Sequence, residues 1–225
     1  MSINENKITN ESHLLQSRLY LNQLIRFVFD FPPDRDAFLE VSNQPQFQSL
    51  CEISNACRTI QKGIQPLLTQ NGEYMKRLQE EYNRLFVGPN VLPAPLWESV
   101  YLDKEHLLFE EVTLTVRECY HHYGLSFIRE GNEPDDHIVI ELEFLHVLIK
   151  KTLESDNLDT QNKLLADQYS FLTNHLLKWC PIFCETLSNS ASFELYQGAA
   201  LLLAEYLELE YELIPALKEA LSNAR

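Results

Sequence analysis

The segment YNRLFVGPNVLPAPLWESVYLD, residues 82–103, interrupts a chain that otherwise has the pattern of helices. Three prolines within residues 89–95 exclude a regular helix there and favour an extended backbone. The segment nevertheless carries large apolar side chains, among them Leu92, Trp97 and Tyr101. A solvated loop has no need of such groups, so we expect them either to be buried or to form the wall of a groove for a partner.

On both sides of this segment, apolar residues recur every three or four positions, which is the period of an amphipathic helix. This period predicts helices within residues 14–29, 34–41, 47–67 and 74–86, and then at about 110–123, 134–149, 160–178, 181–189 and 192–222. No run alternates as a strand would. The sequence therefore predicts an all-α protein of roughly ten helices in a single globular unit.

We expect that unit to have two halves joined by a hinge. The halves are predicted at about 1–124 and 135–225, with the hinge at about 125–134. Pro134 is predicted to open the helix after the hinge, since proline suits the first turn. Asp135 and Asp136 would then lie in that first turn, where the helix dipole favours carboxylates.

Composition narrows the class of partner. The chain has 225 residues with 18 Lys+Arg and 33 Asp+Glu, a formal net charge of −15. Such a charge disfavours nucleic acid and anionic membranes, and it leaves solubility or a cationic partner as explanations. Six glycines and no glycine-rich loop argue against a phosphate-binding enzyme. The five scattered cysteines suggest neither a zinc site nor a disulfide framework and fit a reducing compartment.

The sequence also leaves an enzyme as an alternative. Glu118 with His121, and Glu143 with His146, form two Glu-x-x-His pairs on predicted helices. Di-metal bundles present ligands with this spacing, but they need further carboxylates, and chance matches are common. The alternative is therefore a helical di-metal or hydrolytic enzyme. Against it, the sequence shows no catalytic signature, so we expect no catalytic residue, no metal and no cofactor.

Two segments, 82–103 and NEPDDHIVIELEFLHVL at 132–148, together resemble the TorD/DmsD family of cytoplasmic chaperones for molybdenum reductases. The first is similar to the family's aromatic-x-Arg-Leu-Phe-x-Gly-Pro run and the Trp-x-Ser-Val element that follows it. The second is similar to its Glu-Pro-x-Asp-His motif at the hinge, and WCPIF at 179–183 is similar to a third element. The DmsD branch is the most similar.

This resemblance implies a chaperone, not an enzyme. Family members bind the twin-arginine signal peptide of a reductase catalytic subunit and hold that subunit in the cytoplasm for cofactor insertion before export. The resemblance places leader-binding residues at Tyr82, Leu85, Phe86, Pro95, Trp97, Pro134, Asp136 and His137. It also implies a monomer, with exchange of halves through the hinge as the route to a domain-swapped dimer. The polar amino terminus fits a cytoplasmic protein.

The chemistry of a twin-arginine leader points to some of the same residues as the family resemblance. Such a leader joins two guanidinium groups to an apolar stretch, so its receptor needs carboxylates beside an apolar trough. The candidate carboxylates flank the apolar Pro-rich and hinge segments, and the candidate cation–π partners lie within the first motif. These carboxylates are Glu98, Asp103, Asp135 and Asp136, and the aromatic partners are Trp97 and Tyr101. Leu85, Phe86, Val91 and Leu92 are candidates for the trough.

Several of these residues have a second interpretation. Leu85 and Phe86 have helical spacing and equally suit a core. Trp97 is equally suited to anchor its own loop, and Asp136 to complement the helix dipole. His137 has no evident nucleophile beside it, which favours a structural or recognition role.

Overall fold

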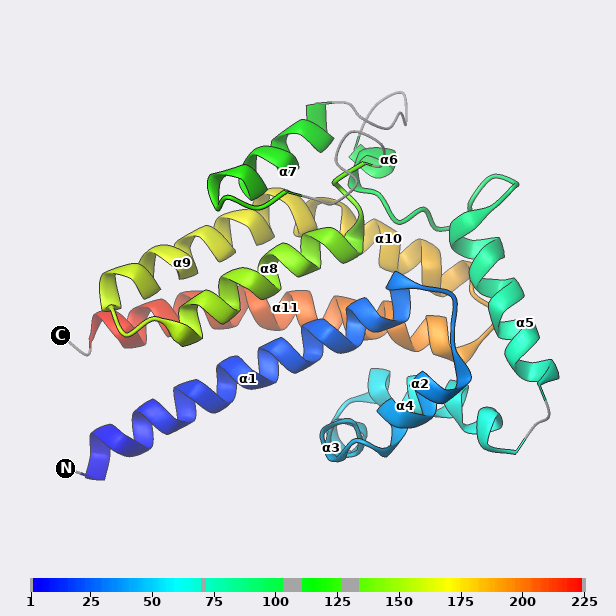
Figure 1. Cartoon of the computed structure of the whole chain (residues 1–225), viewed down its shortest axis with the longest axis horizontal. Coiled ribbons are helices and arrows are strands. Elements are labelled where there is room, and N and C mark those ends of the chain that lie inside the picture. The colour runs from blue at the N-terminus through cyan, green and yellow to red at the C-terminus, as the bar shows by residue number, and fades with distance from the viewer. Residues whose placement is uncertain (1, 70–71, 103–110, 127–133, 224–225) are drawn as a thin grey trace.

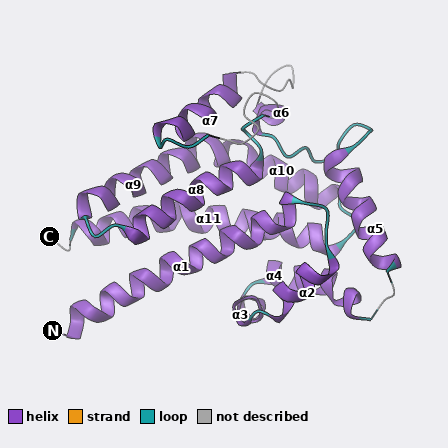
Figure 2. Cartoon of the chain, in the orientation of Figure 1, coloured by secondary structure: helices purple, strands orange, loops and turns teal. Residues whose placement is uncertain are grey.

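A computed structural model describes residues 2–69, 72–102, 111–126 and 134–223. Its helices are α1 (Ser2–Asp30), α2 (Arg35–Asn43), α3 (Pro45–Ile53), α4 (Asn55–Ile64), α5 (Glu73–Tyr82), α6 (Glu98–Leu102), α7 (Glu111–His122), α8 (Ile138–Glu154), α9 (Leu158–Phe171), α10 (Leu177–Ser190) and α11 (Glu194–Ser222). A 3-10 turn at Gln65–Leu68 and π-helical turns at Asn83–Val87 and Leu172–Leu176 join some of them. Figure 2 shows helices and loops with no strand in these ranges, so the predicted all-α fold is confirmed.

The long helices α1, α8, α9 and α11 lie side by side along the long axis (Figure 1). Helices α2, α3 and α4 lie beneath one end of α1, and α4 packs against α11. Helix α10 packs along α11 and also contacts α6. The segment before α6 and the segment before α8 meet above this layer, and α7 starts beyond α6.

A buried polar network ties the long helices together. The guanidinium of Arg18, 1% exposed, donates from Nε to Glu210 Oε1 at 2.8 Å and from Nη2 to Gln168 Oε1 at 2.7 Å. Gln168 in turn donates to Thr152 Oγ1 at 2.8 Å. These groups come from α1, α11, α9 and α8, respectively. Because a buried charge without its partner is costly, the network favours one register of the four helices.

Two glycines allow α4 and α11 to approach closely. A Cβ atom added to Gly198 would lie 2.6 Å from the backbone nitrogen of Ile60, and one added to Gly63 would lie 2.4 Å from that of Leu195. Real Cβ contacts are not that short, so each position requires glycine for the observed packing. The few glycines of the chain thus include two that serve helix packing.

Two predicted helix boundaries were wrong. The helix expected across 47–67 breaks at Ser54, whose side chain accepts a hydrogen bond from Cys57 N and caps α4. The helix expected to open at Pro134 begins at Ile138 instead, with His137 as its N-cap. Asp135 and Asp136 therefore lie in extended chain before the helix, held there by pairing with residues near Trp97.

The break expected before Pro181 is also absent. Pro181 lies inside α10, in its second turn, while the irregularity falls earlier, in the π-helical turn at Leu172–Leu176. The division into two halves at 125–134 stays a prediction, and residues 127–133 of that hinge lie outside the described ranges. In the described residues, no helix is both long and apolar enough to cross a membrane.

We predict that Gly198→Ala destabilises the fold. The added methyl must push apart α4 and α11, and overpacking of this kind costs about 1–3 kcal/mol. Urea unfolding followed by circular dichroism measures the change. Ala216→Leu, a larger addition at an exposed position of the same helix, should leave the free energy of unfolding nearly unchanged. Equal stability of Gly198→Ala and wild type would contradict the packing argument.

Candidate functional site

The two sequence motifs meet through their backbones. Glu98 N donates to Asp136 O at 3.0 Å, and Ile138 N donates to Leu96 O at 2.9 Å. Trp97 and His137 thereby form an isolated antiparallel β-bridge. We call this junction of residues 96–99 with residues 135–138 the clasp. It fixes the extended segment before α6 onto the start of α8.

Asp136 holds the clasp from inside. Its carboxylate is completely buried and accepts from Ser99 N at 2.7 Å through Oδ2 and from Thr113 Oγ1 at 2.9 Å through Oδ1. Asp136 thus caps the first turn of α6 and reaches α7 at the same time. A carboxylate that accepts a backbone N–H at a helix start is a strong, charge-assisted contact.

Asp135 connects the clasp to α7. Its buried carboxylate accepts a short hydrogen bond from Arg117 Nε, and its backbone carbonyl accepts from Tyr120 Oη at 3.1 Å. Arg117 and Tyr120 lie one turn apart on α7, so one residue of the clasp orients that helix.

Glu98 connects the clasp to the π-helical turn. Its carboxylate, 1% exposed, lies 3.1 Å from Nδ1 of His175, and Nε2 of His175 lies 3.9 Å from Sγ of Cys119. Burial lowers the pKa of His175, but the hydrogen bonds with Cys119 and Glu98 raise it to about 9. The imidazole is therefore positive at neutral pH and offsets the buried negative charge of Glu98.

A fourth carboxyl lies nearby on α8. Glu141 is completely buried and accepts from Trp179 Nε1 at 3.3 Å. Burial, with the neighbouring charges of Glu98 and Asp136, holds the pKa of Glu141 well above its ordinary range. Glu141 was not among the residues expected from sequence, because nothing in its local pattern distinguishes it from an exposed helical glutamate.

The aromatic members of the motifs pack against one another at the clasp. The rings of Trp97 and His137 meet edge to face with centroids 5.3 Å apart. Tyr101 Oη donates to the carbonyl of Pro95 at 2.9 Å, and the ring of Tyr101 stacks on that of Trp179 with centroids 5.4 Å apart. Pro95, Trp97, Tyr101 and His137 are each partly exposed, whereas Pro134 is buried.

Tyr82, Leu85 and Phe86 lie in the core. Their exposed fractions are 4%, 0% and 2%, and Tyr82 donates to the carbonyl of Phe29 at 2.9 Å. The expected trough is not formed around them in this structure, since Val91 is 96% exposed while Leu85 and Phe86 are enclosed. These three residues support the Pro-rich segment from below.

The carboxylates expected to receive arginines are therefore already engaged. Glu98, Asp135 and Asp136 are at most 1% exposed and bind groups of the chain itself. Asp103 lies outside the described residues. Direct contact between a leader and the three buried carboxylates would require the clasp to open.

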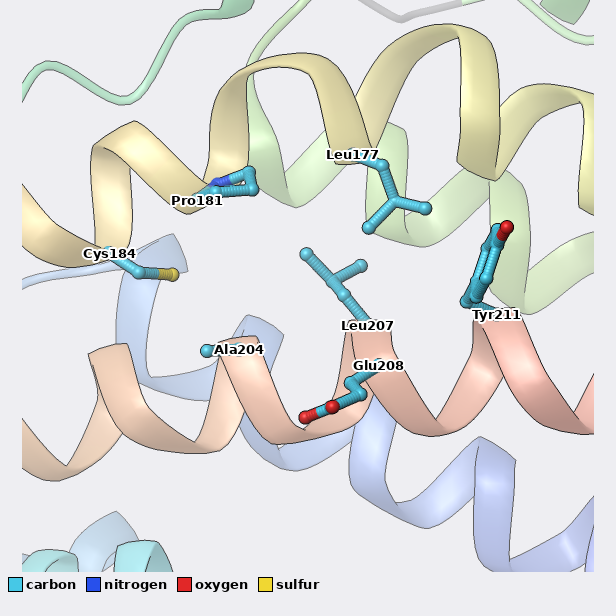
Figure 3. Close-up of a pocket in the computed structure, with 7 residues that line it drawn as sticks. All are labelled: Leu177, Pro181, Cys184, Ala204, Leu207, Glu208 and Tyr211. Carbon is cyan, nitrogen blue, oxygen red and sulfur yellow. The ribbon is translucent and has the colours of Figure 1, made fainter.

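An apolar groove runs between α10 and α11 (Figure 3). Its volume is about 300 Å³, and its walls are formed by Leu177, Pro181 and Cys184 of α10 with Ala204, Leu207, Glu208 and Tyr211 of α11. The sequence did not predict this groove. The spacing of Ala204, Leu207 and Tyr211 beside Glu208 was the available signal.

The two Glu-x-x-His pairs are not assembled into a site. Glu118 and His121 are exposed on α7, while Glu143 on α8 lies 3.1 Å from Arg26 and His146 is half-buried. Within the ranges that the structure describes, no three His, Cys, Asp or Glu side chains are grouped to hold a metal ion.

Residues 51–185 match the family model described as "Nitrate reductase delta subunit". The chain is 30% identical over 208 residues to the "Probable Tat proofreading chaperone DmsD" of Haemophilus influenzae, covering 88% of this chain and 91% of that protein. The chain belongs to the TorD/DmsD family. It is also 29% identical to the "Chaperone protein TorD" of Aliivibrio salmonicida, over 72% of this chain and 75% of that one. With the "Tat proofreading chaperone DmsD" of Salmonella typhi, it shares 34% identity over 57% of this chain and 60% of that one.

Membership of the TorD/DmsD family confirms the chaperone prediction. The matched relatives are named as chaperones, and the family match spans both motifs of the clasp. The chain is accordingly a chaperone and not an enzyme, and the di-metal or hydrolytic alternative has no support.

The Glu98–His175 pair predicts a pH dependence of stability. The pKa of His175 in the folded chain, about 9, lies above its ordinary value of 6.5, so the folded protein binds this proton more tightly than the unfolded chain. The stabilisation is complete below about pH 6.5 and is lost as the pH rises through about 9. We expect the free energy of unfolding in urea to fall across that range.

His175→Gln should flatten this slope, because glutamine does not titrate. His122→Gln, the same change at an exposed position of α7, should keep it. A full slope retained in His175→Gln would show that other groups cause the pH dependence.

Proposed function

We propose that this chain binds the twin-arginine signal peptide of a molybdoenzyme catalytic subunit in the cytoplasm and holds the subunit for cofactor insertion before export. The proposal is supported by the family membership and by the names of the relatives reported above, two of which are called Tat proofreading chaperones. The observation that carries it further is the apolar groove between α10 and α11, because a leader needs an apolar receptor with negative charge close by.

The groove provides the apolar surface in this proposal. The lining of the groove is apolar except for Glu208 and the hydroxyl of Tyr211. The groove lies between the side chains of α10 and those of α11, a shape that suits a helical or extended apolar segment. The leader's apolar stretch would displace water from Leu177, Pro181 and Ala204. Burying apolar area of this kind is the main source of affinity for such a segment.

Exposed carboxylates on α11 and α10 provide the negative charge. Glu208 lines the groove, and Glu185, Glu205 and Glu212 are exposed on the same two helices. Guanidinium groups pair with such carboxylates at distances set by the peptide, and the net charge of −15 steers a basic peptide toward the chain.

The clasp adjoins the groove through α10. Trp179 on α10 stacks on Tyr101, while Leu177 and Pro181 of the same helix face α11. We propose that Pro95, Trp97, Tyr101 and His137 contact the leader at their exposed edges. Glu98, Asp135, Asp136 and Pro134 would hold these edges in place, with Tyr82, Leu85 and Phe86 as the support beneath.

We predict that a twin-arginine leader binds with a dissociation constant in the micromolar range or tighter, and that replacing both arginines by alanine weakens binding by about tenfold or more. Fluorescence anisotropy with a labelled dimethyl sulfoxide or trimethylamine N-oxide reductase leader measures both. Raising the salt concentration should weaken the arginine peptide more than the alanine peptide. Equal affinity of the two peptides would refute the electrostatic part, and no binding of either would refute the proposal.

A pair of neutral substitutions tests the place of binding. Ala204→Gln fills the groove with a polar side chain, so we expect leader affinity to fall by about tenfold. Ala216→Gln, at an exposed position of α11 three turns away, should leave affinity unchanged. Unchanged affinity in Ala204→Gln, with a wild-type melting temperature, would remove the groove from the proposal.

A further inference from the structure

A second pocket lies between α7 and α9. Its volume is about 400 Å³, and its walls include Glu118, Cys119, His122 and Tyr123 of α7, Asp167 of α9, and His175 of the π-helical turn. None of these residues lines the α10–α11 groove. The leader-binding surface proposed above includes none of these residues.

Three side chains at this pocket form a continuous relay. Sγ of Cys119 lies 3.9 Å from Nε2 of His175, and Nδ1 of His175 lies 3.1 Å from Oε2 of Glu98. The buried carboxylate fixes the orientation of the imidazole and aims Nε2 at the sulfur. A thiol beside a histidine that a third group orients is the arrangement of an activated cysteine nucleophile.

The π-helical backbone at His175 and the charge of its imidazole both favour this arrangement of Cys119 and His175. His175 lies in the π-helical turn at Leu172–Leu176, and its ring packs on Phe171 with centroids 4.9 Å apart. Such turns are rare within helices and are frequent at functional sites. With its pKa raised to about 9 against the effect of burial, His175 carries a positive charge next to the sulfur at neutral pH.

The other four cysteines differ from Cys119 in burial and in the pKa of the thiol. All five lie in the described ranges, and Cys119 differs from the other four in being partly exposed. Burial raises the pKa of Cys57 to about 11 and that of Cys184 to about 12. It also raises the pKa of Cys51, and that of Cys180 far above its ordinary range. All four side chains are buried, and their raised pKa values favour the less reactive thiol form.

We propose that Cys119 is a nucleophilic thiol and that its pocket is a site of reversible modification by neutral or cationic low-molecular-weight disulfides. The Cys119 sulfur attacks one sulfur of the disulfide, a new S–S bond forms, and the original S–S bond breaks. The thiol proton leaves to solvent while the positive charge of His175 stabilises the Cys119 thiolate, and the departing thiolate takes up a proton from solvent. Cys119 is oxidised to a mixed disulfide, and the other half of the reagent is released as a reduced thiol.

The charge of the pocket selects this class of ligand. Glu118 and Asp167 bring carboxylates to its walls, and Asp167 also accepts a short hydrogen bond from Tyr123 Oη. The net charge of −15 adds to their effect on an approaching reagent. An amine-bearing disulfide is therefore favoured over one that carries carboxylates.

The test compares cystamine, which is cationic, with oxidised glutathione, which is anionic. Intact mass spectrometry gives the rate of adduct formation at pH 7, peptide mapping locates the adduct, and N-acetylcysteine gives the reference rate for each reagent. Because the positive charge of His175 beside the sulfur favours attack by the thiol group, we expect Cys119 to react with cystamine about tenfold faster than N-acetylcysteine. Oxidised glutathione should show a smaller advantage, and dithiothreitol should restore the original mass.

His175→Gln separates the relay from simple exposure. It should remove most of the rate advantage, whereas His122→Gln, in the same pocket but packed edge-on against Tyr123, should retain it. Cys119→Ser should abolish the fast adduct. The proposal is overturned if wild-type Cys119 reacts no faster than N-acetylcysteine or if the fast adduct maps to another cysteine. These two outcomes need no variant and no leader, so they decide the proposal even if His175→Gln fails to fold or leader binding fails.

Discussion

The buried carboxylate of Asp136 is the contact on which the arrangement of the two motifs depends. It accepts hydrogen bonds from Ser99 N and Thr113 Oγ1, and so joins segments that lie 37 and 23 residues away in the chain. The backbone pairing of Trp97 with His137 then follows, and with it the start of α8 at Ile138. Because Asp136 is fully enclosed, removal of either partner would leave a buried charge without compensation, which is why the junction has one geometry.

Helical period predicted the fold class, and the family resemblance named the two segments that the structure brings together. The helical period did not predict where α8 and α4 begin. His137 and Ser54 set these starts through tertiary pairing or local capping, which overrides the apolar pattern. The sequence singled out the carboxylates Glu98, Asp135 and Asp136, but they were expected to face a peptide. Their actual partners, His175, Arg117 and Thr113, come from helices distant in sequence, and no local pattern shows that pairing. The α10–α11 groove was missed for the same reason, since it requires two helices to be placed side by side.

A chaperone needs a surface for its client and a framework that does not change during binding. Helix α10 joins the two in this chain. One of its faces places Trp179 against Tyr101 and Glu141, and another lines the apolar groove with Leu177 and Pro181. The Arg18–Glu210–Gln168 network fixes α11, the opposite wall of the groove, against α1 and α9. The acidic character of the chain then serves two purposes: buried carboxylates that organise the framework, and exposed ones on α10 and α11 that suit a basic partner.

The most direct test of this account is amide hydrogen exchange of the full chain with and without a saturating twin-arginine leader, read by mass spectrometry. The account predicts slower exchange in peptides covering residues 94–102, 134–141, 177–184 and 204–211. Peptides covering α2 and α3 should exchange at the same rate in both states. Protection confined to α2 and α3, or no protection in the clasp and the groove at saturation, would contradict it.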